Sequence, residues 1–273
     1  MLTMRDKMSE ALPSVSFVPD AASRAGWEAL RALVRAQQPL LCAPWPSAPG
    51  LCGVCRGPAA GRGARCFPCD LHSQCAQGSL ADLVVPVAFA VKGGAHARQL
   101  WQYKSARPGA RAGEAAAQLR ALLLVFLRDH GHCLWQAASG RGPGLGAGPT
   151  HLAVVPTARG RPGPHPLRAL VDPYTSGQWA ELSARPGGQQ VRDLDPDRFV
   201  AAPVPGARVL LLDDTWTTGS SAQSAAMALR RAGARQIVTV ILGRHVAPGW
   251  AGPGAAPFRP ESCAVHQDCD VPR

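Results

Sequence analysis

The chain has 273 residues, of which 46% are hydrophobic, and a formal net charge of +11. This composition is sufficient for a sizeable core, and because no run of about 18 apolar residues occurs, we expect no membrane span. The charge favours anionic partners such as polyphosphate, nucleic acid or an acidic protein. Arginine greatly outnumbers lysine, however, and GC-rich codon usage produces the same skew.

Residues 1–22 carry no long apolar segment of the kind that signal peptides contain, so we expect them to be disordered and the protein to be cytoplasmic. Nine cysteines in a chain without such a signal favour metal binding over disulfides. Residues 23–38 predict an amphipathic helix, whose apolar face would consist of Trp27, Leu30, Leu33 and Val34.

Two CxxC pairs, Cys52 with Cys55 and Cys66 with Cys69, are separated by ten residues rich in glycine. Such knuckles can present four thiolates tetrahedrally to one Zn²⁺, with no position left open for chemistry. We therefore predict a structural zinc ribbon within an N-terminal module of residues 23–78, whose folding depends on the metal. Unligated thiols or disulfides are the alternative interpretation.

A second group lies near the C-terminus, where Cys263, His266 and Cys269 are spaced by three residues. It offers only three candidate ligands, so an ordinary tail is the favoured interpretation over a partial metal site. The tail, residues 246–273, is rich in proline and glycine, and we expect it to be irregular.

Strands and helices alternate through residues 79–245, which predicts an α/β domain with a mostly parallel sheet and flanking helices. The segments 136–150 and 157–206 are predicted to be loops, apart from one short helix. The predicted elements, in chain order, are a strand at Leu83–Val91, helices at Ala95–Tyr103 and Arg111–His130, a strand at His151–Val155, a short helix at Leu167–Leu170, a strand from 207, a helix at Ser220–Ala232 and a strand at Gln236–Leu242. The long helix would bury Leu119, Leu122, Leu123, Phe126 and Leu127.

The most informative stretch begins with four apolar residues, Val209–Leu212, and continues into Asp213 and Asp214. A buried strand of this kind delivers its acidic residues to the carboxyl edge of a parallel sheet, where α/β folds bind ligands. The two carboxylates can accept hydrogen bonds from vicinal hydroxyls such as those of a ribose. The alternative interpretation is an acidic pair that ends a strand and caps a helix.

A turn of threonine, glycine and serine follows the acids and leads into the next helix. Its backbone N–H groups and hydroxyls can surround a phosphate, and the dipole of the helix adds to that attraction. The turn lacks the Gly-x-x-x-x-Gly-Lys and Gly-x-Gly-x-x-Gly patterns, so it is neither a Walker loop nor a dinucleotide-binding loop. The phosphate-binding residues would be Thr217, Thr218, Gly219, Ser220 and Ser221.

This strand, acid pair and turn resemble the 5-phosphoribosyl-1-pyrophosphate (PRPP) motif of the type I phosphoribosyltransferases. With the four-cysteine ribbon before it, the arrangement is similar to that of the ComF-type competence proteins. Two further segments carry the resemblance: Val91–Lys104, a turn and helix that end in a Tyr-Lys pair, and Val154–Arg161, at the place of the family's pyrophosphate loop. The run from Arg159 to Leu167 departs from the family's Arg-Gly-Phe-Asn-like pattern, and Trp216 is bulkier than the usual residue.

The resemblance implies a type I phosphoribosyltransferase-like sheet with flanking helices, preceded by the zinc ribbon. It also implies transfer of the phosphoribosyl group from Mg²⁺-bound PRPP to a nitrogen nucleophile. Asp213 and Asp214 would hold the ribose and Arg159 would face the pyrophosphate, which makes these three the candidate catalytic residues. The rest of the PRPP site would include Pro156, Thr157 and Ala158, with Lys104, Arg161 and His165 as weaker candidates for closing over the pyrophosphate.

Two other functions fit the same sequence. The favoured alternative is a non-catalytic PRPP- or nucleotide-binding factor in single-stranded DNA uptake, acting through DNA or protein contacts, as the ComF resemblance implies and the basic charge allows. The third is an amidophosphoribosyltransferase-like activity, although no catalytic cysteine follows Met1. Relatives with this fold are often dimers, so a homodimer is a further expectation.

Overall fold

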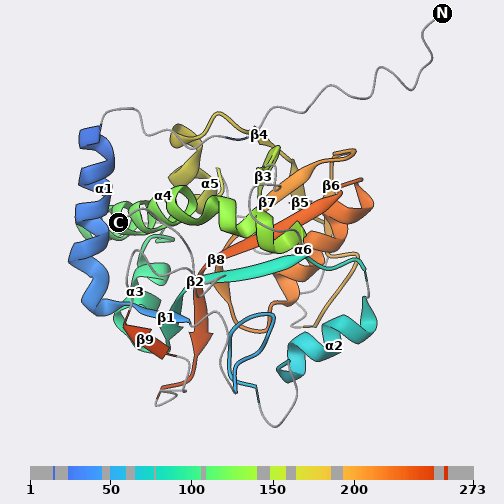
Figure 1. Cartoon of the computed structure of the whole chain (residues 1–273), viewed down its shortest axis with the longest axis horizontal. Helices are drawn as coiled ribbons and strands as arrows, with labels where there is room; N and C mark the ends of the chain where they lie inside the picture. The colour runs from blue at the N-terminus through green and yellow to red at the C-terminus, as the bar shows by residue number, and fades with distance from the viewer. Residues whose placement is uncertain are drawn as a thin grey trace, which may run out of the picture.

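The computed structural model of the chain describes residues 15, 24–44, 50–59, 65–76, 78–105, 109–139, 148–157, 164–185, 193–248 and 255–257. Their main feature is a seven-stranded sheet with the order β4-β3-β7-β8-β2-β1-β9 (Figure 1). The strands of this sheet are β1 (Cys42–Pro44), β2 (Leu83–Val91), β3 (His151–Val154), β4 (Gln178–Trp179), β7 (Arg208–Trp216), β8 (Gln236–Val246) and β9 (Ala255–Pro257).

The five strands from β4 to β2 run parallel, and β1 and β9 pair in the antiparallel sense. The predicted α/β class with a mostly parallel sheet is therefore confirmed. The segments 23–78 and 246–273 each add one strand, β1 and β9, to the same edge of the sheet. The strand β9 is a departure from the irregular tail that proline and glycine predicted, because backbone pairing with β1 gives these three residues a partner.

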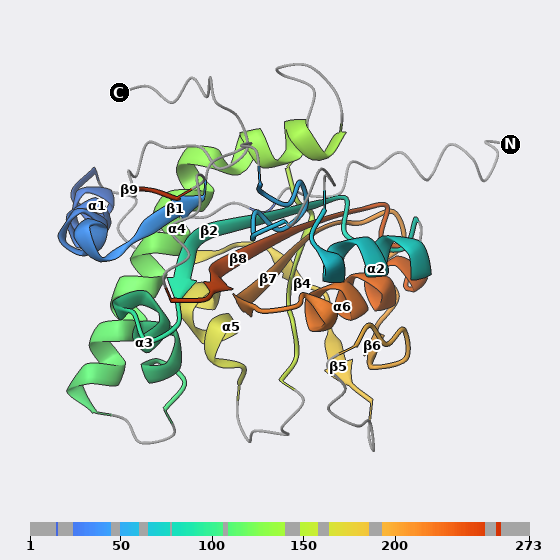
Figure 2. The ribbon, with the colours of Figure 1, turned by 90° about the horizontal axis from the view of Figure 1, so that it is seen from below.

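Helices cover both faces of the sheet (Figure 2). Because successive side chains of a strand point to opposite faces, Leu210 and Leu212 of β7 belong to one apolar cluster, and Val209 and Leu211 belong to the other. The helices that contribute to the first cluster are α1 (Arg24–Gln37), α3 (Ala95–Gln102), α4 (Ala110–Ser139) and α5 (Pro166–Val171), and those of the second are α2 (Phe67–Cys75) and α6 (Ser220–Arg231).

Several predicted helices differ from the observed ones at their ends or on one face. The long helix α4 buries the five predicted residues, but it continues past His130 to Ser139 because Leu134 and Trp135 are also buried. In α1, Val34 is buried as predicted, whereas the side chain of Leu33 is 39% exposed and lies off the buried face. The short helix begins at Pro166, and 3-10 turns form at Gln38–Leu40 and Asp172–Tyr174.

The prediction of loops for 157–206 misses three short strands. One is β4, and the other two, β5 (Leu182–Ala184) and β6 (Phe199–Ala201), form a separate antiparallel pair. Strands of two or three residues are too short to show a periodic pattern in the sequence. Phe199 stabilises this pair because its ring is buried in the cluster that contains α6.

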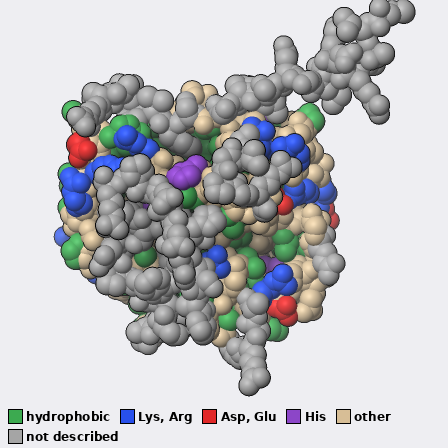
Figure 3. All heavy atoms as spheres, in the orientation of Figure 1, with side chains coloured by type: hydrophobic (Ala, Val, Ile, Leu, Met, Phe, Trp, Pro, Cys, Tyr) green, Lys and Arg blue, Asp and Glu red, His purple; other side chains and the backbone are tan. Residues whose placement is uncertain are grey.

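Basic side chains outnumber acidic ones on the face of the molecule that Figure 3 shows. This distribution agrees with the net charge of +11. Among the described helices, none combines the length and the apolar character that a membrane crossing needs.

Candidate functional site

The carboxyl ends of β3 and β7 form the switch point of the sheet. The chain leaves β3 for β4 on one side, whereas it leaves β7 for β8 on the other side. Open α/β sheets bind ligands in the crevice that such a reversal opens. The Val155 N–H donates to the Leu212 carbonyl at 3.0 Å, so residues 156–157 continue β3 beside the acid pair of β7.

The sheet thus places Pro156 and Thr157 next to the predicted ribose-binding acids. Both acids lie within the last four residues of β7, because the strand runs on to Trp216 instead of ending before them. The remaining predicted pyrophosphate residues, Ala158, Arg159 and Arg161, lie outside the described residues, as do Cys263, His266 and Cys269.

Asp214 is buried, with 7% of its surface exposed, and two residues at the end of α3 hold its carboxylate. Lys104 Nζ donates to Oδ1 at 2.6 Å, and the Tyr103 hydroxyl donates to Oδ2. The sequence predicted Lys104 as a group that closes over the substrate. In the structure its ammonium group neutralises the charge of a buried acid, which a buried carboxylate needs.

Asp213 lies in a different electrostatic environment. Burial raises its pKa to about 7, and the neighbouring Asp214 adds to the shift, while Lys104 and backbone hydrogen bonds oppose it. Asp213 therefore gains and loses its proton near neutral pH, whereas the carboxylate of Asp214 is held by the ammonium group of Lys104. An acid that can both accept and donate hydrogen bonds suits a partner with hydroxyl groups.

The turn after β7 leads into α6 through a glycine in the left-handed conformation. Gly219 adopts φ 87°, in the left-handed region that glycine tolerates, and it precedes the first residue of α6. Thr217 is exposed, and Thr218 accepts from the Ser220 N–H at 3.4 Å. The first N–H groups of a helix lack partners within the helix, so the start of α6 can receive an anion.

Sequence reasoning missed Arg198, which lies at the first turn of α6. Its Nη1 donates to Ser221 Oγ at 2.9 Å, and Nη2 donates to the Asp193 carbonyl at 2.8 Å. The guanidinium is buried, so it brings a fixed positive charge to the helix end where the phosphate would bind. Nothing in the local sequence marks this arginine, because its contact with Ser221 spans 23 positions of the chain.

His165, a weaker candidate for the substrate site, caps a helix. It precedes α5, and its Nδ1 accepts from the Leu167 N–H at 3.2 Å. This interaction satisfies one of the free N–H groups of the first turn.

The four cysteines of the two CxxC pairs come together as predicted. Their sulfur atoms all lie within 4.8 Å of one another, and all four residues are buried. Zinc–sulfur bonds of about 2.3 Å in a tetrahedron require sulfur atoms about 3.8 Å apart, and the Cys55 and Cys66 sulfurs are 3.7 Å apart. The ligand set fits a structural Zn²⁺, which could be held by Cys52, Cys55, Cys66 and Cys69.

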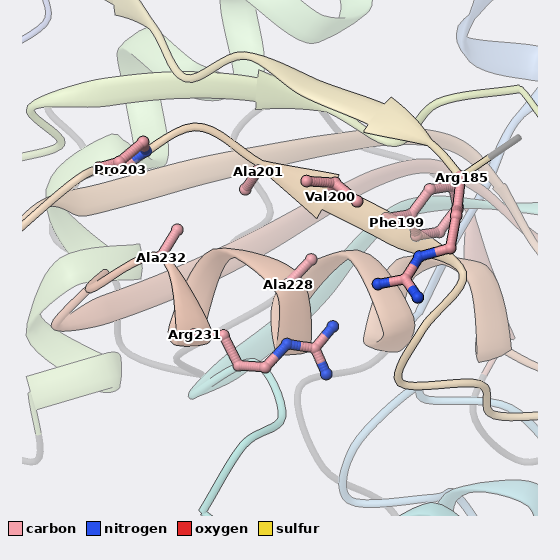
Figure 4. A pocket seen from close by; sticks show the side chains of 8 residues that line it. All are labelled: Arg185, Phe199, Val200, Ala201, Pro203, Ala228, Arg231 and Ala232. Atoms are coloured by element: carbon pink, nitrogen blue, oxygen red, sulfur yellow. The ribbon is translucent and has the colours of Figure 1, made fainter.

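A cavity of about 350 Å³ lies elsewhere, between β6 and α6 (Figure 4). Its lining includes Phe199 and Ala228, and the guanidinium groups of Arg185 and Arg231 reach into the same space. Arg231 is the last residue of α6, whereas Gly219 of the predicted phosphate turn lies just before the first residue of the same helix. The part of α6 that lines the cavity starts at Ala228, eight residues after Ser220 and about 12 Å along the helix axis at about 1.5 Å per residue, so the cavity is separate from the turn.

No protein-family model matches the sequence, and no curated protein matches it. Among solved structures, a hypoxanthine phosphoribosyltransferase from Staphylococcus aureus is similar to 42% of this chain and 78% of its own, with 11% sequence identity and a TM-score of 0.25. A TM-score this low carries no weight for the fold or for the function.

Proposed function

We propose that this chain binds PRPP with its Mg²⁺ at the carboxyl edge of β3 and β7, and that it is a phosphoribosyltransferase-like protein. One observation carries the proposal. The acid pair near the end of β7 and the left-handed turn before α6 lie at the switch point of the sheet, beside the end of β3. A sugar phosphate requires this combination, since its hydroxyls and its phosphate need different partners a short distance apart.

The turn and the start of α6 would hold the 5-phosphate through backbone N–H groups and the hydroxyls of Thr217, Thr218 and Ser220. Arg198 adds positive charge at the same helix end. Asp213 and Asp214 would accept hydrogen bonds from the ribose hydroxyls. The contacts of Asp214 with Lys104 and Tyr103 leave this role open, because a carboxylate offers about four lone-pair sites.

In the transfer, the bond between C1 and the pyrophosphate oxygen breaks, and pyrophosphate leaves with the bonding electrons and its Mg²⁺. The acceptor nitrogen forms the new bond to C1 and loses a proton to solvent. The protein would act by orienting the ribose and by stabilising the departing charge. Arg159 and the backbone of residues 156–158 would face the pyrophosphate. The zinc ribbon is a separate feature, and a reduced, cytoplasmic setting would suit its four thiols.

Calorimetry of the zinc-loaded protein with PRPP and Mg²⁺ tests the proposal. We expect saturable binding, and an affinity at least 10-fold lower in Asp213→Asn, because hydrogen bonds to a charged group contribute about 1.5–3 kcal/mol. Asp197→Asn is the control, since Asp197 is an exposed acid on another element. Absence of binding by the wild-type protein, or equal losses in the two variants, would contradict the proposal.

A non-catalytic PRPP-binding factor is the second candidate. The observation that favours it is the engagement of Asp214 by Lys104 and Tyr103, because these contacts occupy part of the carboxylate that would otherwise bind the ribose. Binding of PRPP without pyrophosphate release across a panel of bases and amines would favour this function. Salt-dependent binding of single-stranded DNA at low ionic strength would then support a role in DNA uptake.

A further inference from the structure

One arginine of β8 lies between the four-cysteine cluster and the phosphate turn. Arg244 pairs with Trp216 in the register of β7 and β8, and only 7% of its surface is exposed. Its guanidinium contacts both the ribbon and the end of β7. The sequence predicts that the ribbon binds zinc, and the end of β7 leads into the turn that the sequence predicts to bind phosphate.

On the ribbon side, the guanidinium packs against the first zinc knuckle. A Cβ added to Gly57 would lie 2.4 Å from Arg244 Nη2, so the arginine occupies the space that any side chain at this position would need. The Gly57 carbonyl accepts from the Cys52 N–H at 2.8 Å, which fixes Gly57 to the knuckle that carries two of the cysteines. The position of Arg244 therefore depends on the conformation of the knuckle.

On the other side, Arg244 holds the strand that leads into the phosphate turn. Nη1 donates to the Trp216 carbonyl at 3.2 Å. The ring of Trp216 is buried directly beneath Gly219, where an added Cβ would lie 2.0 Å from Cζ2. A shift of Trp216 would therefore displace Gly219 and the turn.

Two polar groups at this junction are buried without partners in the described part of the chain. Arg244 Nε and Trp216 Nε1 are buried and have no hydrogen-bond partner among the described residues. Each such donor costs about 1–3 kcal/mol of stability. Unpaired buried donors of this kind call for an explanation, and a role in the geometry of the site supplies one.

We infer that Arg244 is a positioning residue that couples the zinc site to the phosphate turn. A zinc-ordered knuckle holds the guanidinium, the guanidinium holds the Trp216 carbonyl, and the Trp216 ring supports Gly219. The zinc thereby raises the affinity of a turn that it does not touch. The phosphate part of this coupling rests on the proposed PRPP site, whereas the structural link from the knuckle to Trp216 does not.

Coupling between two binding sites is reciprocal, which gives a test that does not depend on turnover. Ribose 5-phosphate is the probe, and the zinc affinity of the full chain is measured by equilibrium competition with a chromophoric chelator. We expect saturating ribose 5-phosphate to raise the zinc affinity of the wild-type protein at least fivefold. In Arg244→Met the same ligand should change it less than twofold, although the variant still binds zinc.

Gly57→Ala disturbs the same link while it leaves the arginine in place. The added methyl group meets the guanidinium, so this variant should lose most of the effect of ribose 5-phosphate on zinc affinity. Gly113→Ala is the matched control, because a Cβ there meets no atom within 4 Å. If the effect persists in both Arg244→Met and Gly57→Ala, the inference is wrong.

A second readout separates this inference from the proposed function. The indole N–H signal of Trp216, assigned with Trp216→Phe, should move in zinc-loaded Gly57→Ala relative to the wild type. The signal of Trp179, which donates to Asp172 on another element, should stay unchanged. If the wild type does not bind ribose 5-phosphate, the proposed function fails, and the Trp216 signal still decides whether the knuckle and the turn are linked. An unmoved Trp216 signal would overturn the link.

Discussion

Lys104 Nζ lies 2.6 Å from Asp214 Oδ1, and this ion pair ties the end of α3 to the carboxyl edge of the sheet. The two residues are 110 positions apart in the chain. Asp214 is thus bound to a cation. For the adjacent Asp213, burial and the neighbouring Asp214 raise the pKa to about 7. The candidate ribose site therefore contains one carboxyl group bound to a lysine and one that titrates near neutral pH.

Lys104→Met should destabilise the protein by about 1–2 kcal/mol in urea unfolding. Removal of one partner of a fully buried pair costs about 3–5 kcal/mol, but the Lys104 side chain is 34% exposed, so water screens part of the interaction. Lys92→Met is the control, because Lys92 is exposed and forms no ion pair among those observed. Equal stability of the two variants would contradict the assigned role of Lys104.

Asp213→Asn should change how stability depends on pH. The native pKa of about 7 exceeds the ordinary value of 3.8, so the native state holds a proton that the unfolded state has already lost. Ionisation of Asp213 therefore costs the wild type stability as pH rises from about 4 to about 7, and that stability stays lost at higher pH.

The variant lacks this cost, so its unfolding free energy relative to wild type should rise by roughly 2 kcal/mol or more across that range, since one pKa unit is about 1.4 kcal/mol. Thermal or urea unfolding at a series of pH values measures the difference. Buried His96, whose pKa burial lowers, acts in the opposite sense in both proteins and cancels. A difference that does not vary with pH would show that Asp213 titrates normally.

Gly219→Ala should weaken binding of ribose 5-phosphate at least 10-fold and destabilise the protein by about 2–4 kcal/mol. The substitution combines a strained φ with a collision against the Trp216 ring. Gly206→Ala separates the two effects, because Gly206 also has a positive φ, of 68°, but an added Cβ there meets nothing within 4 Å. We expect Gly206→Ala to cost about 1 kcal/mol and to leave binding unchanged. A similar loss of binding in both variants would remove the turn from the site.

Metal analysis of the purified protein should give about one zinc per chain. Cys52→Ser and Cys66→Ser should lose the metal and unfold at lower temperature, because metal binding contributes to the folding of a small module. Cys75→Ser is the matched control, since Cys75 lies in the same helix as Cys69 but is exposed. Retention of zinc by both of the first two variants would rule out the predicted ligand set.

Local patterns in the sequence predicted the elements of the site well. The bounds of β2 agree with the prediction, and those of α6 differ by one residue at its end, because apolar runs and helical spacing are properties of neighbouring residues. The CxxC pairs predicted a cluster that the fold forms. The short strands β5 and β6 were missed, since their stability comes from pairing with each other and from burial of Phe199 against α6.

The sequence by itself determined where the acid pair, the phosphate-binding turn and the four zinc-binding cysteines would lie along the chain. Spacing within a strand, a turn or a knuckle is enough to predict each of these features. Only the tertiary structure decided what each of them contacts. Lys104 meets Asp214, Arg198 meets Ser221, and Arg244 meets Trp216 through contacts between distant segments. Such contacts depend on how the helices and the ribbon pack against the sheet, and no local pattern encodes that packing.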